Sequence, residues 1–425
     1  MISLSVFLFS PAQKTICCRI ICEVNQMSLL DELSVPGRWE AFLEYRSSLC
    51  SKGRIKELEE FVSRREYLPV CAAIREGKTF PLPEKSVINK NGSQKKRVVY
   101  KYPRGETAVL KLLTHLILRR YDSIFSPGLF SFRPGHTAKT AVSRFTHGKT
   151  SGLYCYKADI SNYFNSIPVK LLLPMLRNVL WDDPELYAFL SRLLTEPYVL
   201  ERGRPICEQK GIMAGTPLSA FYANLFLSEL DRSFYERNIP YARYSDDIIV
   251  FAKSREECEA CADEIRDFLS RCGLSINPDK EKFSSPGEGW SFLGFCCCGN
   301  KIDIAPVTLD KLRHKMRRKS RALRRWSKRN DISGERAAAA FIRIFNRKLL
   351  EAPENNELSW SCWFFSVINT SESLHRIDLY AQDCIRWLIS GKRTKARFDV
   401  RYDQLRAMGY RSLVNAYYSY SKAQS

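Results

Sequence analysis

The sequence predicts an α+β fold, with short strands grouped in the middle of the chain and helices before and after them. Residues 37–78 and the region from Pro306 onward carry apolar residues at helical spacing. Between them, the run from Arg243 to Phe251 places two adjacent carboxylates, Asp246 and Asp247, between a polar-aromatic stretch and an apolar, β-branched one. This pattern favours a strand, a tight turn and a second strand, with both acids at the hairpin tip.

Taken alone, the Asp246–Asp247 pair has two interpretations. Carboxylate oxygens are hard ligands that suit Mg²⁺. Asp is also common in ordinary solvated turns, and for a single motif the turn is the commoner explanation. The rest of the chain must therefore decide between a turn and a metal site.

Length and charge narrow the class of protein. The 425 residues predict two or three domains, or one large multi-lobed enzyme. The chain has 67 Lys and Arg against 46 Asp and Glu, a net charge of +21 that predicts a polyanionic partner, most simply nucleic acid. An anionic membrane surface is the alternative. No apolar run reaches the roughly 18 residues of a transmembrane helix.

The 15 cysteines are scattered along the chain, which predicts reduced thiols in a cytoplasmic protein. Cys258 and Cys261 form one CxxC without a second pair at zinc spacing, so no zinc is expected. The run Cys296 to Cys298 is expected to pack as small hydrophobic residues.

Residues 1–26 form a leader of doubtful status. Its apolar stretch, residues 2–9, has no basic segment before it and no clear cleavage site after it, which disfavours a signal peptide. Either Met27 is the natural initiator, or the leader is a mobile extension.

The first strand region follows the N-terminal helices. Asn91-Gly92 predicts a hairpin turn, and residues 97–102 are expected to form a strand. This segment contains five cations: Lys90, Lys95, Lys96, Arg97 and Lys101. A solvated sheet edge is the commoner explanation, but such a hairpin would also suit a triphosphate.

The next segments lead to a third carboxylate. Residues 109–121 predict an amphipathic helix, residues 130–135 a loop, and residues 153–160 a strand that ends at Asp159. Asp159 is either a ligand at a strand end or the N-cap of a following helix, and taken alone the N-cap is favoured.

A glycine-led turn, residues 211–219, is expected to begin a helix over residues 218–235 and could approach a phosphate or a base pair closely. Residues 256–272 predict a helix that Gly273 ends, and residues 277–280 a turn into a strand.

The helix predicted over residues 309–326 is strongly basic. Its apolar residues are Leu309, Leu312, Met316, Leu323 and Trp326. Its cations are Lys311, Arg313, Lys315, Arg317, Arg318, Lys319, Arg321, Arg324 and Arg325. Because Asp310 is almost the sole acid among them, contact with a phosphate backbone is favoured over a merely solvated face. Residues 331–336 look like a linker before an aromatic, helical remainder.

In this order the segments resemble the catalytic region of reverse transcriptases, the bacterial branch more than the retroviral one, over roughly residues 80–330. The matching motifs are residues 90–103 and 132–135 of the fingers, 157–167 around the first catalytic aspartate, 211–231 with Gly215, Pro217, Leu218, Ser219, Ala223 and Asn224, Tyr244-Ser245-Asp246-Asp247, 273–280 and 290–295.

The resemblance implies a right-hand polymerase with fingers, an antiparallel palm sheet with helices, and a helical thumb. The implied divisions are a leader (1–26), an N-terminal helical region (27–78), fingers (79–152), a palm with part of the fingers inserted (153–305), and the thumb with the C-terminal region (306–425).

The resemblance also implies roles for individual residues. Asp159, Asp246 and Asp247 would be the catalytic residues and would hold two Mg²⁺ ions, with Asp247 in a supporting part. Phe164 matches a bulky residue that excludes a 2′-hydroxyl, and Lys280 a proposed proton donor to pyrophosphate. The nucleotide-binding positions are Lys90, Arg97, Phe164, Gly215 and Lys280. The primer grip matches Leu293 and Gly294, and the cations expected on the nucleic-acid backbone are Lys311, Lys315, Arg318, Arg321 and Arg325.

Some features depart from the relatives. Bacterial members usually have Gln where this chain has Ala214, which puts fine contacts to the template or the new base pair in doubt. Retron enzymes usually carry Val-Thr-Gly where this chain has Val307-Thr308-Leu309, and group II intron enzymes usually add a maturase region.

The chain most resembles the unclassified, defence-associated bacterial enzymes. This implies a structured non-coding RNA as template and partner, a DNA or RNA primer, dNTPs, a cDNA product and a role in antiphage defence. The alternatives are a group II intron or retron enzyme of a mobile element, a template-independent polymerase, and a non-catalytic RNA-binding module on a polymerase fold.

Overall fold

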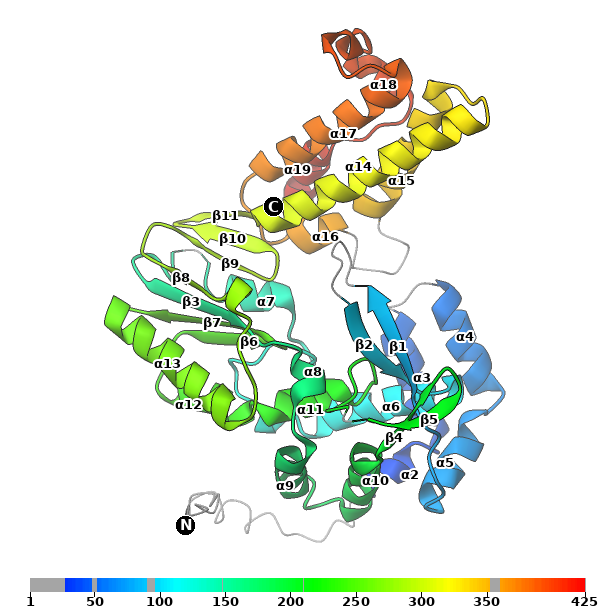
Figure 1. The fold of residues 1–425 in the computed structure, drawn as a ribbon, viewed down its shortest axis with the longest axis vertical. Coiled ribbons are helices and arrows are strands. Elements are labelled where there is room, and N and C mark those ends of the chain that lie inside the picture. The colour runs from blue at the N-terminus through cyan, green and yellow to red at the C-terminus, as the bar shows by residue number, and fades with distance from the viewer. Residues whose placement is uncertain are drawn as a thin grey trace.

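In the computed structural model, three small sheets lie between N-terminal helices on one side and a projecting group of C-terminal helices (Figure 1). The α+β prediction is therefore confirmed. The structure describes residues 27–47, 52–89, 96–146, 148–208, 210–351 and 360–424. Lys90, Lys95 and the Asn91-Gly92 turn lie outside the described residues, as does the leader. No helix within the described ranges is long and apolar enough to cross a membrane.

The N-terminal helices are built around Trp39, which is fully buried and donates its indole N–H to the Leu33 carbonyl at 2.8 Å. Tyr67 stacks on Trp39 with ring centroids 4.7 Å apart. The helices are α2 (Leu29–Glu32), α3 (Pro36–Ser47), α4 (Lys52–Ser63), α5 (Tyr67–Arg75) and α6 (Arg104–Arg120). The helical pattern predicted for residues 37–78 is thus confirmed.

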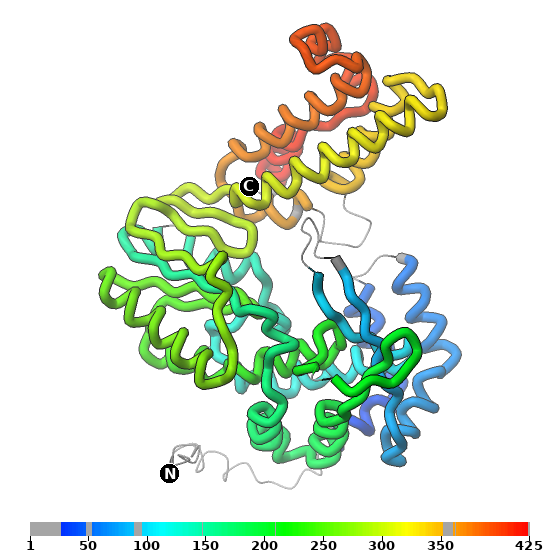
Figure 2. Tube along the Cα trace, in the orientation of Figure 1, coloured from blue at the N-terminus to red at the C-terminus, as the bar shows by residue number. Residues whose placement is uncertain are grey.

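The first sheet joins distant parts of the chain in the order β2-β1-β4-β5 (Figure 2). Strands β1 (Glu84–Asn89) and β2 (Lys96–Lys101) are antiparallel. Strands β4 (Tyr198–Glu201) and β5 (Arg204–Cys207) form a second hairpin, and Glu84 pairs with Leu200 to join the two.

The central sheet has the order β6-β7-β3-β8 and separates two hydrophobic cores. Side chains alternate across it, so Ile248 and Val250 of β7 enter one core while Ile249 and Phe251 enter the other. Its strands are β3 (Tyr154–Asp159), β6 (Tyr241–Tyr244), β7 (Asp247–Ala252) and β8 (Lys282–Ser284).

Helices surround the first core. They are η1 (Asp122–Ile124), α8 (Tyr163–Ser166), α9 (Val169–Val179), α10 (Pro184–Thr195), α11 (Ser219–Phe226), α12 (Ser228–Glu236) and α13 (Arg255–Arg271). Helix α7 (Ala138–Ser143) instead contributes Ala141 and Val142 to the second core, and the short η2 (Pro278–Lys280) after α13 has no buried residue. The single helix predicted over residues 218–235 is wrong, because Leu227 leaves helical geometry at φ −108° and ψ 15°. Helix α11 is buried on all sides whereas α12 has an exposed face, so the two segments pack in different surroundings.

The second core lies under β9 (Trp290–Phe292), β10 (Phe295–Cys298) and β11 (Lys301–Ile304) and continues into the C-terminal helices. Of the three cysteines on β10, Cys297 is buried, Cys296 is half-buried and Cys298 is exposed, so the hydrophobic packing predicted for the cysteine run applies fully to Cys297 alone. The helices are α14 (Pro306–Arg329), α15 (Gly334–Leu349), α16 (Trp360–Phe365), α17 (Glu372–Ser390), η3 (Lys395–Asp399), α18 (Tyr402–Ala407) and α19 (Leu413–Gln424).

Two predictions about α14 and the residues that follow it differ from the structure. Trp326 is 41% exposed instead of buried, and Ser320 and Ser327 take inward positions because small side chains allow α15 and α17 to approach closely. The linker predicted over residues 331–336 is right only for residues 331–333, because α15 begins at Gly334 and the Ser333 hydroxyl accepts from the Arg336 N–H.

Candidate active site

The β6–β7 hairpin has the predicted tight turn, and the turn is two residues long. Tyr244 at the end of β6 pairs with Asp247 at the start of β7, so Ser245 and Asp246 form the turn between them. Ser245 has a φ of +60°, a left-handed conformation that tight hairpin turns require and that side chains other than glycine seldom adopt. Both acids therefore lie at the hairpin tip.

Asp159 joins these two acids at the same end of the sheet. It is the last residue of β3 and pairs with Asp247 across the ladder, and the following residue, Ile160, donates its N–H to the Asp246 carbonyl at 3.0 Å. The N-cap interpretation of Asp159 is wrong, because Asn162 precedes the next helix, α8. Two separate segments thus bring three carboxyl groups together.

Burial and neighbouring negative charge raise the pKa values of Asp246 and Asp247. Burial raises the pKa of Asp246, and the negative charge of Asp159 adds to this rise. Burial likewise raises the pKa of Asp247 to about 6; Asp246 and Asp159 add to the rise, while the positive charges of Lys157 and Lys280 oppose it. Clustered carboxylates that are partly removed from water behave in this way, and a nearby positive charge is needed to keep them ionised.

Lys280 supplies one such charge. Its Nζ lies 2.5 Å from Asp159 Oδ1; the Asp159 side chain is 6% exposed and that of Lys280 45%. The segment before η2 is held against β3, because Asn277 donates its N–H to the Asp159 carbonyl at 2.7 Å. Within the described ranges, no group of three or more His, Cys, Asp or Glu side chains is arranged as a ready metal site. The metal-binding role of the three acids stays a prediction.

A second group of predicted residues meets beside the acids. The Arg97 guanidinium lies 5.9 Å from the Phe164 ring centroid, so two predicted nucleotide-binding residues are in contact. Asn165, which sequence reasoning missed, donates to the Val98 carbonyl at 3.2 Å and accepts from the Ala214 N–H at 3.0 Å. In the sequence, the signal that could have identified Asn165 was its position directly after Phe164.

The glycines of the 211–216 loop allow this close packing. Gly211 has a φ of +55°, and an added Cβ would lie 2.6 Å from the Phe164 carbonyl oxygen. Gly215 has a φ of +98°, and its added Cβ would lie 3.2 Å from the Tyr100 carbonyl oxygen. Gly215, which the sequence predicts to bind the nucleotide, therefore lies against the backbone of β2. A side chain at either position would push the loop away from α8 or β2.

Leu293 and Gly294, the predicted primer grip, form the turn between β9 and β10, with φ values of +51° and +92°. The Gly294 carbonyl accepts from the Ala305 N–H at 2.9 Å and from the Thr308 hydroxyl at 3.4 Å. The turn is therefore fixed to the start of α14.

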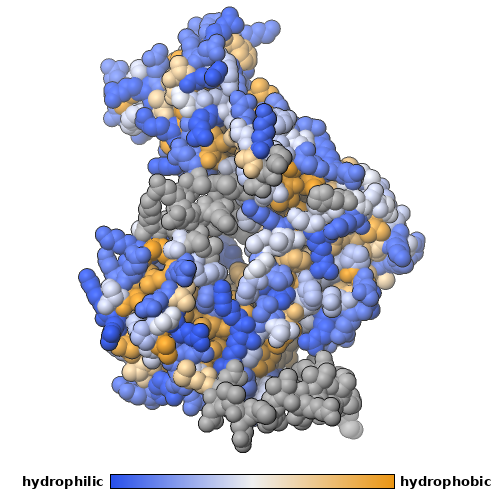
Figure 3. Space-filling view, turned by 180° about the vertical axis from the view of Figure 1, so that it is seen from behind, coloured by the Kyte–Doolittle hydropathy of each residue, from blue (hydrophilic) through white to orange (hydrophobic). Residues whose placement is uncertain are grey.

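The cations of α14 divide into two sets. Arg313 lies 5.1 Å from the Tyr380 ring centroid, and Arg324 donates to the Leu388 carbonyl at 3.0 Å, so both contact α17. The five predicted backbone contacts are exposed and, among the described residues, form no ion pair: Lys311, Lys315, Arg318, Arg321 and Arg325. Hydrophilic residues dominate the face of the C-terminal helices in Figure 3.

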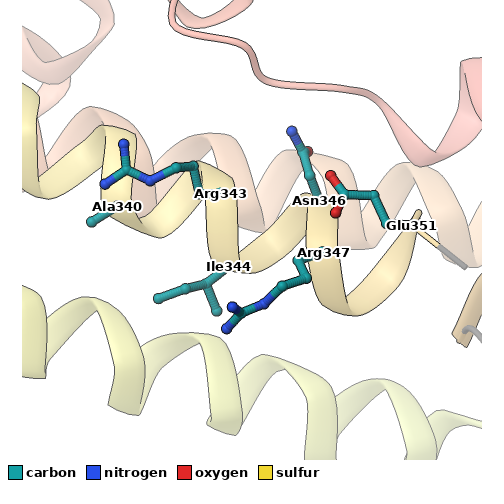
Figure 4. Close-up of a pocket in the computed structure, with 6 residues that line it drawn as sticks. All are labelled: Ala340, Arg343, Ile344, Asn346, Arg347 and Glu351. Atoms are coloured by element: carbon teal, nitrogen blue, oxygen red, sulfur yellow. The ribbon is translucent and has the colours of Figure 1, made fainter. Parts of the chain in front are cut away.

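A cavity of 410 Å³ lies apart from these residues, along α15. It is lined by Ala340, Arg343, Ile344, Asn346, Arg347 and Glu351 (Figure 4). None of the predicted site residues lines it.

Sequence reasoning also missed the buried pair of Arg243 and Asp231 beneath the hairpin, whose side chains are both 0% exposed. An arginine within an otherwise apolar and aromatic strand was the signal that could have revealed it.

Residues 88–297 match the family model described as reverse transcriptase (RNA-dependent DNA polymerase). The chain is 23% identical over 214 residues to the protein YkfC of Escherichia coli K12, covering 41% of this chain and 56% of YkfC. It is 23% identical over 235 residues to the retron Ec86 reverse transcriptase of Escherichia coli, covering 54% of this chain and 67% of that one.

The group II intron-encoded protein LtrA of Lactococcus lactis is 21% identical over 200 residues, covering 47% of this chain and 33% of LtrA. The matched part is thus little more than half of YkfC and a third of LtrA. Among solved structures, apo telomerase from Candida tropicalis aligns with a TM-score of 0.43 and 10% identity, covering 80% of this chain and 69% of that one.

Proposed function

Residues 88–297 form a reverse transcriptase domain related to those of bacterial group II introns and retrons, and from this premise we propose that the chain is an RNA-directed DNA polymerase. The observation that carries the proposal is the meeting of Asp159, Asp246 and Asp247 at one end of an antiparallel sheet within the matched region. Nucleotidyl transfer needs such clustered carboxylates from separate segments.

The donor set fits divalent metal ions. Three carboxylates supply hard oxygen ligands. Burial first, and then neighbouring negative charge, raise the pKa values of Asp246 and Asp247, and a bound cation would offset both effects. In the proposal, Asp159 and Asp246 hold two Mg²⁺ ions, and Asp247 supports them. When bound there, the ions would supply Lewis-acid activation of the primer 3′-hydroxyl and charge stabilisation for the leaving pyrophosphate.

The surrounding residues bind and orient the substrates in this scheme. Arg97 contacts the triphosphate, and the Phe164 ring lies against the sugar and excludes a 2′-hydroxyl. Lys280, released from Asp159, donates a proton to the pyrophosphate. The contact between Arg97 and Phe164 supports a common nucleotide pocket. The proposal retains Lys90 as a triphosphate ligand.

The wider assignments follow the right-hand scheme. We assign residues 79–152 to the fingers, 153–305 to the palm with part of the fingers inserted, and 306–425 to the thumb and C-terminal region. Leu293 and Gly294 would position the primer end. The unpaired cations of α14, from Lys311 to Arg325, would follow the phosphate backbone of the template–primer duplex.

We further propose that the template is a dedicated structured non-coding RNA and that the cDNA serves antiphage defence in the cytoplasm. The motif resemblance to unclassified, defence-associated enzymes supports this role. A mobile-element enzyme of the group II intron or retron kind is the second candidate, because the curated relatives carry those names. Sequencing the RNA and DNA that co-purify with the chain separates the two.

The test of catalysis uses purified protein, Mg²⁺, dNTPs and the co-purifying RNA. We expect wild-type protein to make cDNA and the double variant Asp246→Asn/Asp247→Asn to make none while binding RNA normally. Synthesis by the double variant would refute the active-site assignment. RNA binding without synthesis by wild type would favour the non-catalytic RNA-binding module, and synthesis without RNA a template-independent polymerase.

The sugar selection has its own test. Phe164→Ala removes the ring and should raise the use of rNTPs relative to dNTPs by at least about tenfold in kcat/KM, as expected when a clash is relieved. An unchanged ratio would show that Phe164 does not select the sugar.

A further inference from the structure

Arg243 and Asp231 form an ion pair that is completely buried beneath the catalytic turn. The pair is bidentate, with Nε 2.7 Å from Oδ1 and Nη2 2.5 Å from Oδ2, and the Tyr241 hydroxyl also donates to Oδ1 at 2.8 Å. Removing two charges from water costs about as much as their attraction returns, so such a pair contributes little net stability. Its contacts show a more specific use.

The remaining donors of Arg243 reach the turn itself. Nη1 donates to the Ser245 carbonyl at 3.3 Å and to the Ala223 carbonyl at 3.4 Å, and Nη2 donates to the Asn224 carbonyl at 3.1 Å. Ser245 directly precedes Asp246 and has a left-handed backbone. One guanidinium therefore ties the peptide that orients Asp246 to the end of helix α11.

The same network reaches the segment that carries the other catalytic acid. The Tyr163 hydroxyl, four residues after Asp159, donates to the Ala223 carbonyl at 2.6 Å. Asn224 is in turn held by Ser131, through Oγ to Oδ1 at 3.0 Å and Nδ2 to the carbonyl at 2.7 Å. The two acid-bearing segments are thus attached to one buried anchor at α11.

We propose that Asp231 and Arg243 are positioning residues that hold Asp246 in place relative to Asp159, as metal binding and nucleotide transfer require. This inference rests on the proposed function. Lysine cannot replace the arginine, because a single ammonium cannot make two parallel bonds to Asp231 and also reach three carbonyls on two segments, α11 and the hairpin turn.

Arg243→Lys tests the proposal, with Arg120→Lys as its matched control. The Arg120 side chain is 12% exposed and pairs with Asp182 at 2.9 Å, near the start of α10, where it contacts neither the hairpin nor α11. We expect Arg243→Lys to lower kcat by about 10–100-fold, as outer partners of metal ligands do, while the dNTP KM and RNA affinity change by less than about threefold. Arg120→Lys should leave kcat unchanged.

A metal readout separates positioning from general damage. Mn²⁺ binding, followed by electron paramagnetic resonance without nucleic acid, should weaken about tenfold in Arg243→Lys and stay unchanged in Arg120→Lys. If both variants lose thermal stability alike and both keep kcat and Mn²⁺ affinity at temperatures where they are folded, the proposal is overturned.

Milder variants guard against misfolding. Asp231→Asn keeps the shape of the side chain, and Tyr241→Phe removes a single donor to Asp231. Tyr241→Phe should therefore fold and should lose less kcat and Mn²⁺ affinity than Arg243→Lys. Wild-type activity of Tyr241→Phe and Asp231→Asn would overturn the proposal. If wild-type protein binds Mn²⁺ through Asp246 but makes no cDNA, the proposed function fails and the Mn²⁺ affinities still decide the positioning role.

Discussion

Replacing Lys280 with Met should tighten divalent metal binding and, at the same time, slow nucleotide addition. Lys280 Nζ lies 2.5 Å from Asp159 Oδ1, the oxygen that a metal ion would need. Asp159 is buried but Lys280 is about half exposed, so solvent screens the pair, and an interaction of about 1 kcal/mol is the upper end expected. In Lys280→Met a metal ion does not have to displace this ammonium group. Its binding free energy therefore improves by up to that amount, which is roughly fivefold in affinity.

The catalytic rate should move in the opposite direction. A positioned general acid contributes on the order of 100-fold or more, so Lys280→Met should lower kcat by at least about 100-fold. The assay is a Mn²⁺ titration of free protein at low ionic strength, paired with single-nucleotide addition at saturating metal.

Lys282→Met is the matched control for this experiment. Lys282 lies two residues further on, is exposed on β8, and pairs across the sheet with Lys157, so its removal deletes the same charge without vacating an Asp159 oxygen. The reasoning is refuted if Lys280→Met binds Mn²⁺ no more tightly than wild type, or if Lys282→Met gains as much.

Three further predictions concern other parts of the chain. Burial lowers the pKa of His115 to about 4, below its ordinary 6.5, so the folded protein loses stability as the pH falls from about 6.5 towards 4. After allowance for the partial exposure of the ring, the loss is about 1 kcal/mol at pH 5. The variant His115→Gln cannot take up this proton and should therefore show a flatter dependence of Tm on pH. Lys315→Ala should lower the salt slope of RNA binding by about one without changing Tm, whereas Arg313→Ala, which removes a contact with α17, should lower Tm. Asp378 accepts four hydrogen bonds at the start of α19, so Asp378→Asn should cost about 3 kcal/mol in urea unfolding, against about 0.5 kcal/mol or less for the more exposed Asp383→Asn.

The sequence predicts those parts of the site that local pattern determines. The two-residue turn at Ser245 and Asp246 follows from the change from polar to β-branched residues, and the strand end at Asp159 follows from alternation. Both features depend on neighbours in the chain, and the order of motifs then indicates that these segments meet. Trp326 was mispredicted because helical spacing shows which residues share a face but not how wide the buried face is.

Contacts between distant segments were beyond this reasoning. The Lys280–Asp159 pair spans 121 positions and the Asn165–Val98 bond spans 67. Arg243 and Asp231 are only 12 positions apart, yet their pairing depends on the break at Leu227 that directs α12 back towards β6. Amphipathic spacing gave no sign of that break, because all residues of α11 except the half-buried Ala220 are buried.

The loop around Ala214 is held in place without the glutamine that bacterial relatives usually have at this position. The Ala214 N–H bonds to Asn165 Oδ1 at 3.0 Å, and the Ala214 carbonyl accepts from the Tyr100 N–H at 2.8 Å, so backbone groups alone hold the loop between α8 and β2. The residue is 1% exposed, which leaves no open space for a longer side chain without rearrangement. The methyl group of Ala214 therefore fills its place in the loop, beside the neighbouring contact between Phe164 and Arg97.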